Sequence, residues 1–367
     1  MRHLIIILFL SFLVSNILAD EHLIKDDIDG RLQEQKNLKN SILSDHLQFM
    51  KDEYDLALIL SFMSVGQYDF ISQEDASGDR IDFNIHYRFK SNLSFATKIE
   101  MQGKFGEYSS GDYKKVIGSY NKLSPGFDDL DPYVKELWTQ YKSKNVSIRA
   151  GIINTNSFVD QSFYNNFVKF YMSHASSSQS YGEIPLSSLG VGVKYSEKDY
   201  YVNAVLSDAT QHLEDAIDDI KNSDLTPYAT VEVGLTPEKN IYFINLWSKT
   251  DKERSDSYGM YLSLNQYLDE YNKIYMKYGR NKDAAIKQHA SVGWSHNTLF
   301  DSNDLLLTAL STSQNSSSSK FQNTLEVLYK YKFNYGIELS GDMQVIQNLD
   351  TDEDIATVIG ARFNIVF

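Results

Sequence analysis

The 367-residue sequence contains no cysteine and only five prolines, and these shortages narrow the classes of protein to which the chain can belong. Without cysteine the chain cannot be a lipoprotein or a disulfide scaffold, and it cannot use thiol chemistry. After Ala19 there is no run of 18 apolar residues, so no transmembrane helix is predicted. Tyr (25) and Phe (20) are abundant while proline is scarce, which is a balance typical of strands.

A basic surface is also missing, because the formal net charge is −14. Nucleic-acid-binding proteins need clustered Lys and Arg, so an acidic chain is a poor candidate for that partner. Eight scattered His residues lack a metal-ligand spacing, and neither GxSxG nor GxxxxGK[ST] occurs. We therefore expect no enzyme activity, no metal and no cofactor.

The first residues have the pattern of a secretory signal peptide. Met1-Arg-His is positive, Leu4 to Val14 is almost continuously apolar, and Ser15-Asn-Ile-Leu-Ala19 offers a cleavage site. A transmembrane anchor is the alternative, but the apolar run is short for a span. Removing residues 1–19 takes away one basic residue, Arg2, so the mature chain would carry a charge of −15.

Residues 20–53 differ from everything that follows, since they are charged and favour helix. Pairs such as Ile24/Ile28 and Leu43/Leu47 stand at i, i+4 spacing. This predicts one or two short periplasmic helices, with a solvated linker as the alternative.

The last strand-like segment, Thr357 to Phe367, alternates at period two. Its odd-numbered residues are Thr357, Ile359, Ala361, Phe363, Ile365 and Phe367, and the even-numbered face admits Arg362 and Asn364. One apolar face and one partly polar face suit a wall between lipid and water. Phe363, Ile365 and the terminal Phe367 also look like the closing strand that the barrel assembly machinery reads in bacterial outer membranes.

From Leu56 onward the pattern predicts sixteen strands in an all-β, transmembrane antiparallel barrel that spans residues 54–367. The expected strands are 56–66, 81–90, 92–104, 134–142, 145–152, 189–196, 199–207, 226–235, 239–249, 257–267, 271–279, 289–296, 303–312, 321–333, 335–347 and 355–367. In the strand at 321–333, Leu328 is an exception to the alternation.

The connections indicate how such a barrel would be oriented. Short turns are expected at 90–92, 143–144, 196–198, 236–239 and 334, and long loops at about 105–133, 153–188 and 208–225. If both ends of the barrel segment are periplasmic, the short turns fall on the periplasmic side and the long loops outside. An even strand number with this asymmetry is typical of outer-membrane barrels of Gram-negative bacteria.

Three segments together resemble the carbohydrate-selective porin family (OprB-like outer-membrane porins). They are residues 137–160, Lys277-Tyr-Gly-Arg280 with 293–304, and 325–367 through Met343-Gln-Val-Ile-Gln-Asn348. Ile152 stands where the family usually has Lys, Lys277 replaces its usual Arg, and the usual prolines of the last segment are missing. The resemblance implies a sixteen-stranded outer-membrane porin that passes glucose-like sugars by diffusion.

A sugar pore needs aromatic faces and hydrogen-bonding charged or amide groups on its inner wall. Alternation predicts the lumen candidates Arg88, Lys98, Glu100, Trp138, Arg149, Asp342, Gln344 and Arg362, with Glu326, Lys330 and Glu338 on the same faces. Arg88, Arg149 and Arg362 are favoured because a mid-strand Arg facing lipid would cost about 2–4 kcal/mol. Ordinary lumen charges without solute contact are the alternative, and Trp138 could instead belong to an aromatic girdle.

The loop 153–188 is too long for a simple connection, so we expect it to fold inward and narrow the channel. Asp160, His174 and Glu183 are its lumen candidates, although its Ser-rich tip could be solvated. Asp350-Thr-Asp-Glu-Asp354 begins like a calcium loop, but Ile355 stands where Gly is needed, so a solvated loop is favoured.

The sequence therefore predicts a passive outer-membrane porin, with sugars, membrane lipid and the assembly machinery as partners and with possible homo-oligomers. A general or cation-preferring porin stays open as an alternative, as does a structural or adhesive barrel with a closed lumen.

Overall fold

The computed structural model describes residues 50, 54–90, 92–124, 126–164, 166, 169–177, 183–185, 187–209, 225–250, 255–333, 336–351 and 353–367. The predicted signal peptide (1–19) lies outside these residues. The same is true of the predicted segment 20–53, apart from Met50.

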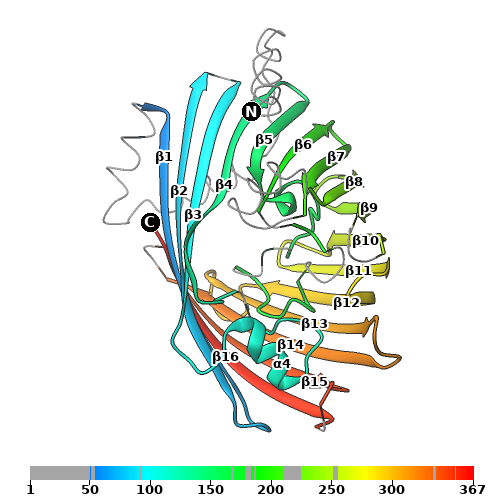
Figure 1. The fold of residues 1–367 in the computed structure, drawn as a ribbon. Helices are drawn as coiled ribbons and strands as arrows, with labels where there is room; N and C mark the ends of the chain where they lie inside the picture. Colours follow the sequence, from blue (N-terminus) through cyan, green and yellow to red (C-terminus); the bar gives the residue numbers. More distant parts are fainter. Residues whose placement is uncertain are drawn as a thin grey trace.

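Sixteen strands form one closed antiparallel barrel, in which β1 pairs with β16 (Figure 1). The predicted fold and strand number are confirmed. The strands are β1 (Leu56–Asp69), β2 (Asp75–Lys90), β3 (Leu93–Lys104), β4 (Leu130–Lys142), β5 (Val146–Ile153), β6 (Ser188–Ser196), β7 (Tyr200–Asp208), β8 (Pro227–Leu235), β9 (Ile241–Lys249), β10 (Ser257–Tyr267), β11 (Asn272–Lys282), β12 (Ile286–Asn297), β13 (Asp304–Asn315), β14 (Phe321–Lys332), β15 (Ile337–Gln347) and β16 (Ile355–Val366).

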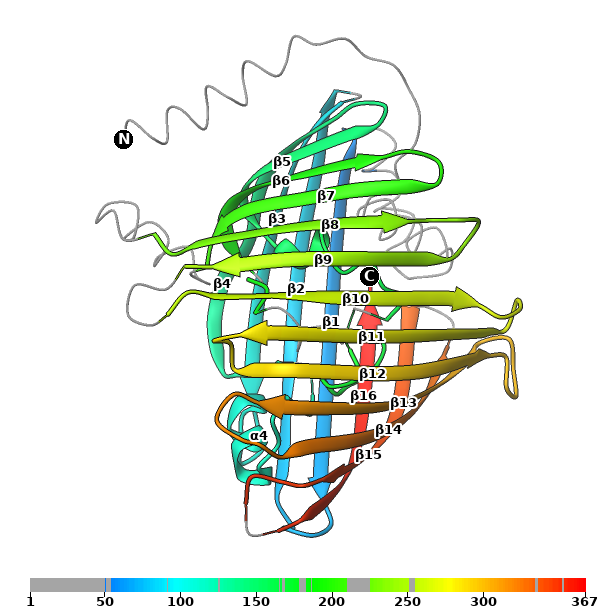
Figure 2. The same cartoon turned by 90° about the vertical axis from the view of Figure 1, so that its right-hand side faces the viewer.

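Figure 2 shows that β5–β12 are stacked in front and run crosswise to β1, β2 and β16 behind them. This crossing is what a closed barrel of tilted strands gives, since strands on its opposite sides tilt in opposite directions. Strand alternation separates its two surfaces, because successive side chains point to opposite faces. On β14, for example, Leu325 is exposed on the outside while Glu326 and Leu328 are buried inside.

The first hairpin is longer than predicted, since β1 ends at Asp69 and β2 begins at Asp75 rather than at Ile81. Ser77 and Asp79 are polar or small on the outer face, so this part of β2 lacks the apolar alternation that marks a strand. Its pairing is still regular, with Gly66 opposite Ser77 and Ser64 opposite Asp79.

The strand ends that are joined by the three long connections, 105–129, 154–187 and 209–226, all lie at one end of the barrel. The expected strict contrast between the two ends is only partly present. At the same end as the long connections, those at 70–74, 250–256, 283–285, 316–320 and 348–354 are short as well.

Two of the long connections contribute to the barrel interior, and we call them the first inner segment (105–129) and the second inner segment (154–187). The first holds α4 (Ser110–Ile117), whose N-cap Ser109 accepts a hydrogen bond from the backbone of Asp112. Gly118 ends the helix in the left-handed region (φ 73°), where a side chain is strained. Among the described residues, no helix is long and apolar enough to cross a membrane.

An apolar core joins these segments to one wall of the barrel. From the wall come Met63, Val65, Leu305, Leu307, Leu328, Ile346 and Val358, and from the inner segments come Tyr113, Ile117, Leu123, Phe127, Tyr164, Tyr171 and Met172. Leu328, which broke the alternation in the sequence, is fully buried in this core. The exception therefore marks the place where the inner wall is covered by protein instead of water.

Candidate functional site

A cluster of charged side chains covers the inner face of β2, β3 and β4. Glu100 is its centre: it accepts hydrogen bonds from Lys135 Nζ (2.7 and 2.9 Å) and Tyr133 (2.6 Å) and forms an ion pair with Arg80. Beside it, Asp82 pairs with Arg80 (3.1 Å) and Lys98 (2.9 Å). We call Arg80, Asp82, Lys98, Glu100, Tyr133 and Lys135 the charged cluster.

A β-bulge builds this cluster. The register between β3 and β4 shifts at Lys98/Ile99, where the partner changes from Glu136 to Val134 and skips Lys135. The extra residue changes which side chains point inward, and Tyr133 and Lys135 both reach Glu100 as a result. Simple alternation from Glu136 would have placed them outside.

Trp138 does face inward, as predicted, but Arg149 covers it. The guanidinium carbon lies 4.0 Å from the ring centroid, a cation–π contact. Arg149 also donates to Gln140 Oε1 (2.9 and 3.0 Å) and Ser157 Oγ (2.8 Å), and only 2% of it is exposed. Arg149 therefore fastens the second inner segment to β4 and leaves almost no guanidinium surface for a solute.

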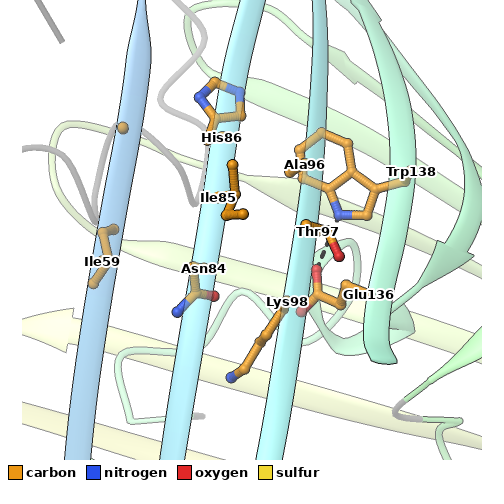
Figure 3. A pocket seen from close by; sticks show the side chains of 10 residues that line it. Ile59, Asn84, Ile85, His86, Ala96, Thr97, Lys98, Glu136 and Trp138 are labelled. Atoms are coloured by element: carbon orange, nitrogen blue, oxygen red, sulfur yellow. Dashed lines mark hydrogen bonds between the residues drawn. The ribbon is translucent and has the colours of Figure 1, made fainter. Parts of the chain in front are cut away.

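A small cavity adjoins the charged cluster on the side of the short turns, and Lys98 belongs to both (Figure 3). Its inward-facing lining comes from four consecutive strands: Ala57, Ile59, Asn84, His86, Ala96, Lys98, Glu136 and Trp138. Glu136 accepts a hydrogen bond from the indole Nε1 of Trp138 (3.0 Å). The volume is about 40 Å³, which is room for a few water molecules. Asn84, His86 and Lys98 are only partly buried, although the Lys98 ammonium pairs with Asp82 (2.9 Å) and the His86 Nε2 is itself buried.

Elsewhere the inner wall holds the backbone of the inner segments. Its polar side chains bond to backbone amides and carbonyls at both segments. The wall residues are Gln67, Gln102, Gln322 and Gln344 for the first segment, and Asn203, Glu232, Asn265, Glu326, Lys330 and Arg362 for the second. These contacts satisfy loop backbone that is buried away from water, where an unpaired group would be costly.

The predicted lumen residues divide between these roles. Lys98 and Glu100 belong to the charged cluster, and Arg362 donates to the Phe170 carbonyl (2.9 Å). Gln344 donates to the Leu123 carbonyl (2.8 Å) and to Asp342 (2.7 Å). Arg88 lies two residues before the end of β2 and is exposed, so its expected mid-strand position is wrong.

The three candidates on the second inner segment do not converge. Asp160 lies 3.5 Å from Lys277 Nζ, whereas the exposed Glu183 accepts from the backbone of Ala285 (3.0 Å). The backbone of His174 donates to the Lys122 carbonyl (2.9 Å) of the first inner segment. Burial, together with the nearby Lys122 and Lys114, lowers the pKa of His174 to about 3. The segment does fold inward, but these residues do not form one constriction ring.

The closing strand has the predicted orientation. Phe363 and Ile365 lie on the outer face, and the backbone of Phe367 exchanges two hydrogen bonds with Leu60 across the seam (2.8 and 3.2 Å). Sequence reasoning missed Arg80, Asp82, Asn84, His86, Lys135 and Glu136. The inward parity of Asn84 and His86 could have been read from Ile81–Phe89, whereas the bulge at Lys135 left no signal.

Comparisons with known proteins agree with this architecture. No family model matches the chain, and no curated protein does. OprB of Pseudomonas putida, in a high-pH structure, is similar with a TM-score of 0.73 at 11% identity, over 87% of this chain and 96% of that one. A variant of the Rh. blastica porin has a TM-score of 0.60 at 11% identity, over 85% and 100%. OmpT of Vibrio cholerae, an outer membrane protein in a trimer form, has a TM-score of 0.54 at 12% identity, over 85% and 99%. The chain therefore has the sixteen-stranded barrel fold of porins.

Proposed function

We propose that this chain is an outer-membrane diffusion porin for small neutral sugars. The observation that carries the proposal is the inner cavity on β1–β4, which combines Trp138 with the Asn84 amide, the Lys98 ammonium and the Glu136 carboxylate. Amide, ammonium and carboxylate groups hydrogen-bond sugar hydroxyls. Trp138 lines the cavity, but Arg149 covers its ring and only 4% of it is exposed, so the polar groups carry the contact. The cavity is too small to enclose a sugar, so it would serve as a weak contact along the path.

The outer surface supports a membrane location. Large apolar side chains are exposed on the outward faces of successive strands, including Leu246, Leu262, Leu264, Met276, Val292, Leu310 and Leu325. Aromatic residues such as Tyr258, Tyr271, Tyr87 and Phe89 are exposed near strand ends, where girdles stand in outer-membrane barrels. Transport would be passive, with no bond made or broken. The predicted signal peptide 1–19, the periplasmic segment 20–53 and recognition of Phe363, Ile365 and Phe367 by the assembly machinery are parts of this proposal, as is a homo-oligomer.

A barrel with a closed lumen is the second candidate, and one observation favours it. Among the described strands, the inward-facing residues at mid-barrel are almost all buried against the inner segments or one another. Such a barrel would present its outer loops to a partner and would not conduct. The same burial means that, if the chain is a diffusion porin, its path for solute must be narrow.

Planar-bilayer conductance tests the proposal. A porin should give ion currents, and glucose or a maltose-type oligosaccharide should reduce them with millimolar or weaker affinity, because solute must leave as readily as it enters. Asn84→Val should weaken this block about two- to tenfold, the value of one neutral hydrogen bond. Asn297→Val, the same change at an inward position of β12 outside the cavity, should leave it unchanged.

Each outcome assigns the barrel to one class. Currents without sugar block would indicate a general or cation-preferring porin, and a folded barrel without currents would indicate the closed-lumen alternative. Equal loss of block in both Asn variants would show that the cavity on β1–β4 is not the contact.

A further inference from the structure

Four buried side-chain oxygens gather where the inner segments meet β1, β14 and β15. They are Gln67 Oε1, Glu326 Oε2, Asp342 Oδ1 and Gln344 Oε1, and none has a hydrogen-bond partner among the described residues. We call them the oxygen cluster. Buried polar atoms are nearly always satisfied, so four such acceptors in one place call for an occupant that supplies hydrogen-bond donors or positive charge.

Strand register brings these residues together. Gln344 stands directly opposite Glu326, and Asp342 is two residues earlier on the same face of β15. Gly360 on β16 stands between Gln67 on β1 and Asp342 on β15, its two cross-strand partners. Because glycine has no side chain, nothing on β16 separates the Gln67 and Asp342 side chains. The space above Gly360 is instead taken by Gln67 and Met172.

Hydrogen bonds fix the other half of each group and so orient the free oxygens. Gln67 Nε2 and Gln344 Nε2 both donate to the Leu123 carbonyl at 2.8 Å, and Gln344 Nε2 also donates to Asp342 Oδ2 at 2.7 Å. Glu326 Oε1 accepts from the backbone of Met172 (2.7 Å) and Ser173 (3.1 Å). The Glu326 and Asp342 carboxyl groups lie within hydrogen-bonding reach of each other.

The charges around the cluster do not neutralise it. Arg362 acts on both carboxylates, but its guanidinium donates to the Phe170 carbonyl and the Ser340 hydroxyl. One positive charge faces two carboxylates in a buried site, which is costly. The Ser176 hydroxyl lies beside Glu326 and can donate one proton, and a proton shared by the two carboxyl groups pairs Glu326 with Asp342. Even then Gln67 Oε1 and Gln344 Oε1 have no donor in the part of the chain that the structure describes.

We propose that the oxygen cluster binds a hard cation, with Ca²⁺ as the best match. Carboxylate and amide oxygens are the ligands that Ca²⁺ prefers, and two carboxylates with two amide carbonyls supply four of the six to eight that it takes. A cation here would tie the Leu123 and Met172 regions of the two inner segments to the wall. The proposal does not depend on sugar permeation.

Terbium luminescence of the full barrel in detergent provides the test, because Tyr171 and Tyr275 lie beside Glu326 and can sensitise the ion. We expect one saturable Tb³⁺ site per barrel that Ca²⁺ displaces. Glu326→Gln and Asp342→Asn should each weaken it at least tenfold. Glu338→Gln and Asp350→Asn remove carboxylates outside the cluster and should change affinity less than twofold.

If the carboxyl variants do not fold, Gln67→Met provides a neutral replacement that removes one ligand, and it should weaken Ca²⁺ binding at least threefold in a folded barrel. A wild-type barrel that binds no Ca²⁺ would overturn the proposal, and so would binding that survives equally in all cluster variants. Loss of binding in the Asp350→Asn control would assign the ion to the exposed turn instead.

Discussion

The inner faces of β2–β4 and β13–β16 differ in how their inward-pointing side chains are stabilised. On β2–β4 the charged cluster is satisfied by its own members, as Glu100 takes Arg80, Lys135 and Tyr133. On β13–β16 the wall is apolar at Leu307, Leu328 and Val358, and its polar groups hold loop backbone. We call β2–β4 the charged wall and β13–β16 the apolar wall. The charged wall holds a self-paired charge network beside partly buried polar side chains, whereas the apolar wall anchors the inner segments.

This contrast indicates where a path through the barrel could run. Partly buried side chains such as Asn84, His86 and Lys98 lie on the charged wall, next to the cavity. On β13 and β14, which follow in the barrel beyond the β1–β16 pair, Leu307 and Leu328 are fully covered. Substitutions on β2–β4 should therefore affect both stability and transport. Substitutions on β13–β16 should affect stability and how tightly the inner segments close the lumen.

The largest expected effect comes from the centre of the charged cluster. Glu100→Gln leaves Arg80 and Lys135 buried without their shared carboxylate, which should lower the free energy of unfolding by about 3–5 kcal/mol. Urea unfolding of the barrel in detergent, followed by tryptophan fluorescence, measures it. Adding Lys135→Met should recover part of the loss, because one of the unpaired cations is removed. A double variant less stable than Glu100→Gln would contradict this account.

On the apolar wall, Leu328→Ala should lower the free energy of unfolding by about 2–5 kcal/mol, the range for a fully buried leucine. Leu325→Ala, on the lipid side of the same strand, is the matched control and should lose much less, since Leu325 is 42% exposed. Leu328→Ala should also increase conductance if it loosens the inner segments. Equal stability losses in the two variants would show that the inner core contributes little.

How far the sequence predicted this arrangement depends on the range of the interactions. The strand number and the two faces of β16 follow from alternation, which is a local pattern. In the structure Ile359 and Phe363 lie on the outer face of β16 and Arg362 on the inner face. The bulge at Lys135 depends on a partner strand some 35 residues away in the chain, so no local pattern announces it.

The burial of Arg149 and Arg362 shows the same limit at the site. Alternation placed both side chains inside. It could not reveal that Arg149 would donate a hydrogen bond to Ser157 and Arg362 one to the Phe170 carbonyl. Those partners belong to loop backbone and short polar side chains, which carry no periodic signal. The only trace in the sequence was Leu328, an apolar residue on a face that water would otherwise cover.

A smaller, pH-dependent effect is expected where the inner segments meet. The pKa of His174 is lowered by burial to about 3 in the folded state, against an ordinary value near 6.5. The unfolded chain therefore binds a proton more readily, so stability should be constant above about pH 6.5 and fall as pH drops from there towards 3. Lys122 and Lys114 face the imidazole and oppose its charging. His174→Gln should flatten this fall in urea unfolding at successive pH values, and an unchanged pH profile would contradict it.

The smallest effect is expected at the mouth of the charged wall. Arg88 has the inward parity of β2 but is exposed near its end, so Arg88→Gln should change the free energy of unfolding by less than about 0.5 kcal/mol. Its charge is screened over about 10 Å at 0.1 M salt and about 3 Å at 1 M. The reversal potential of the variant should therefore shift slightly towards cations in 0.1 M KCl and match wild type in 1 M KCl. A shift that persists at high salt would place Arg88 in the narrow part of the path and would move the solute contact from the cavity to the end of β2.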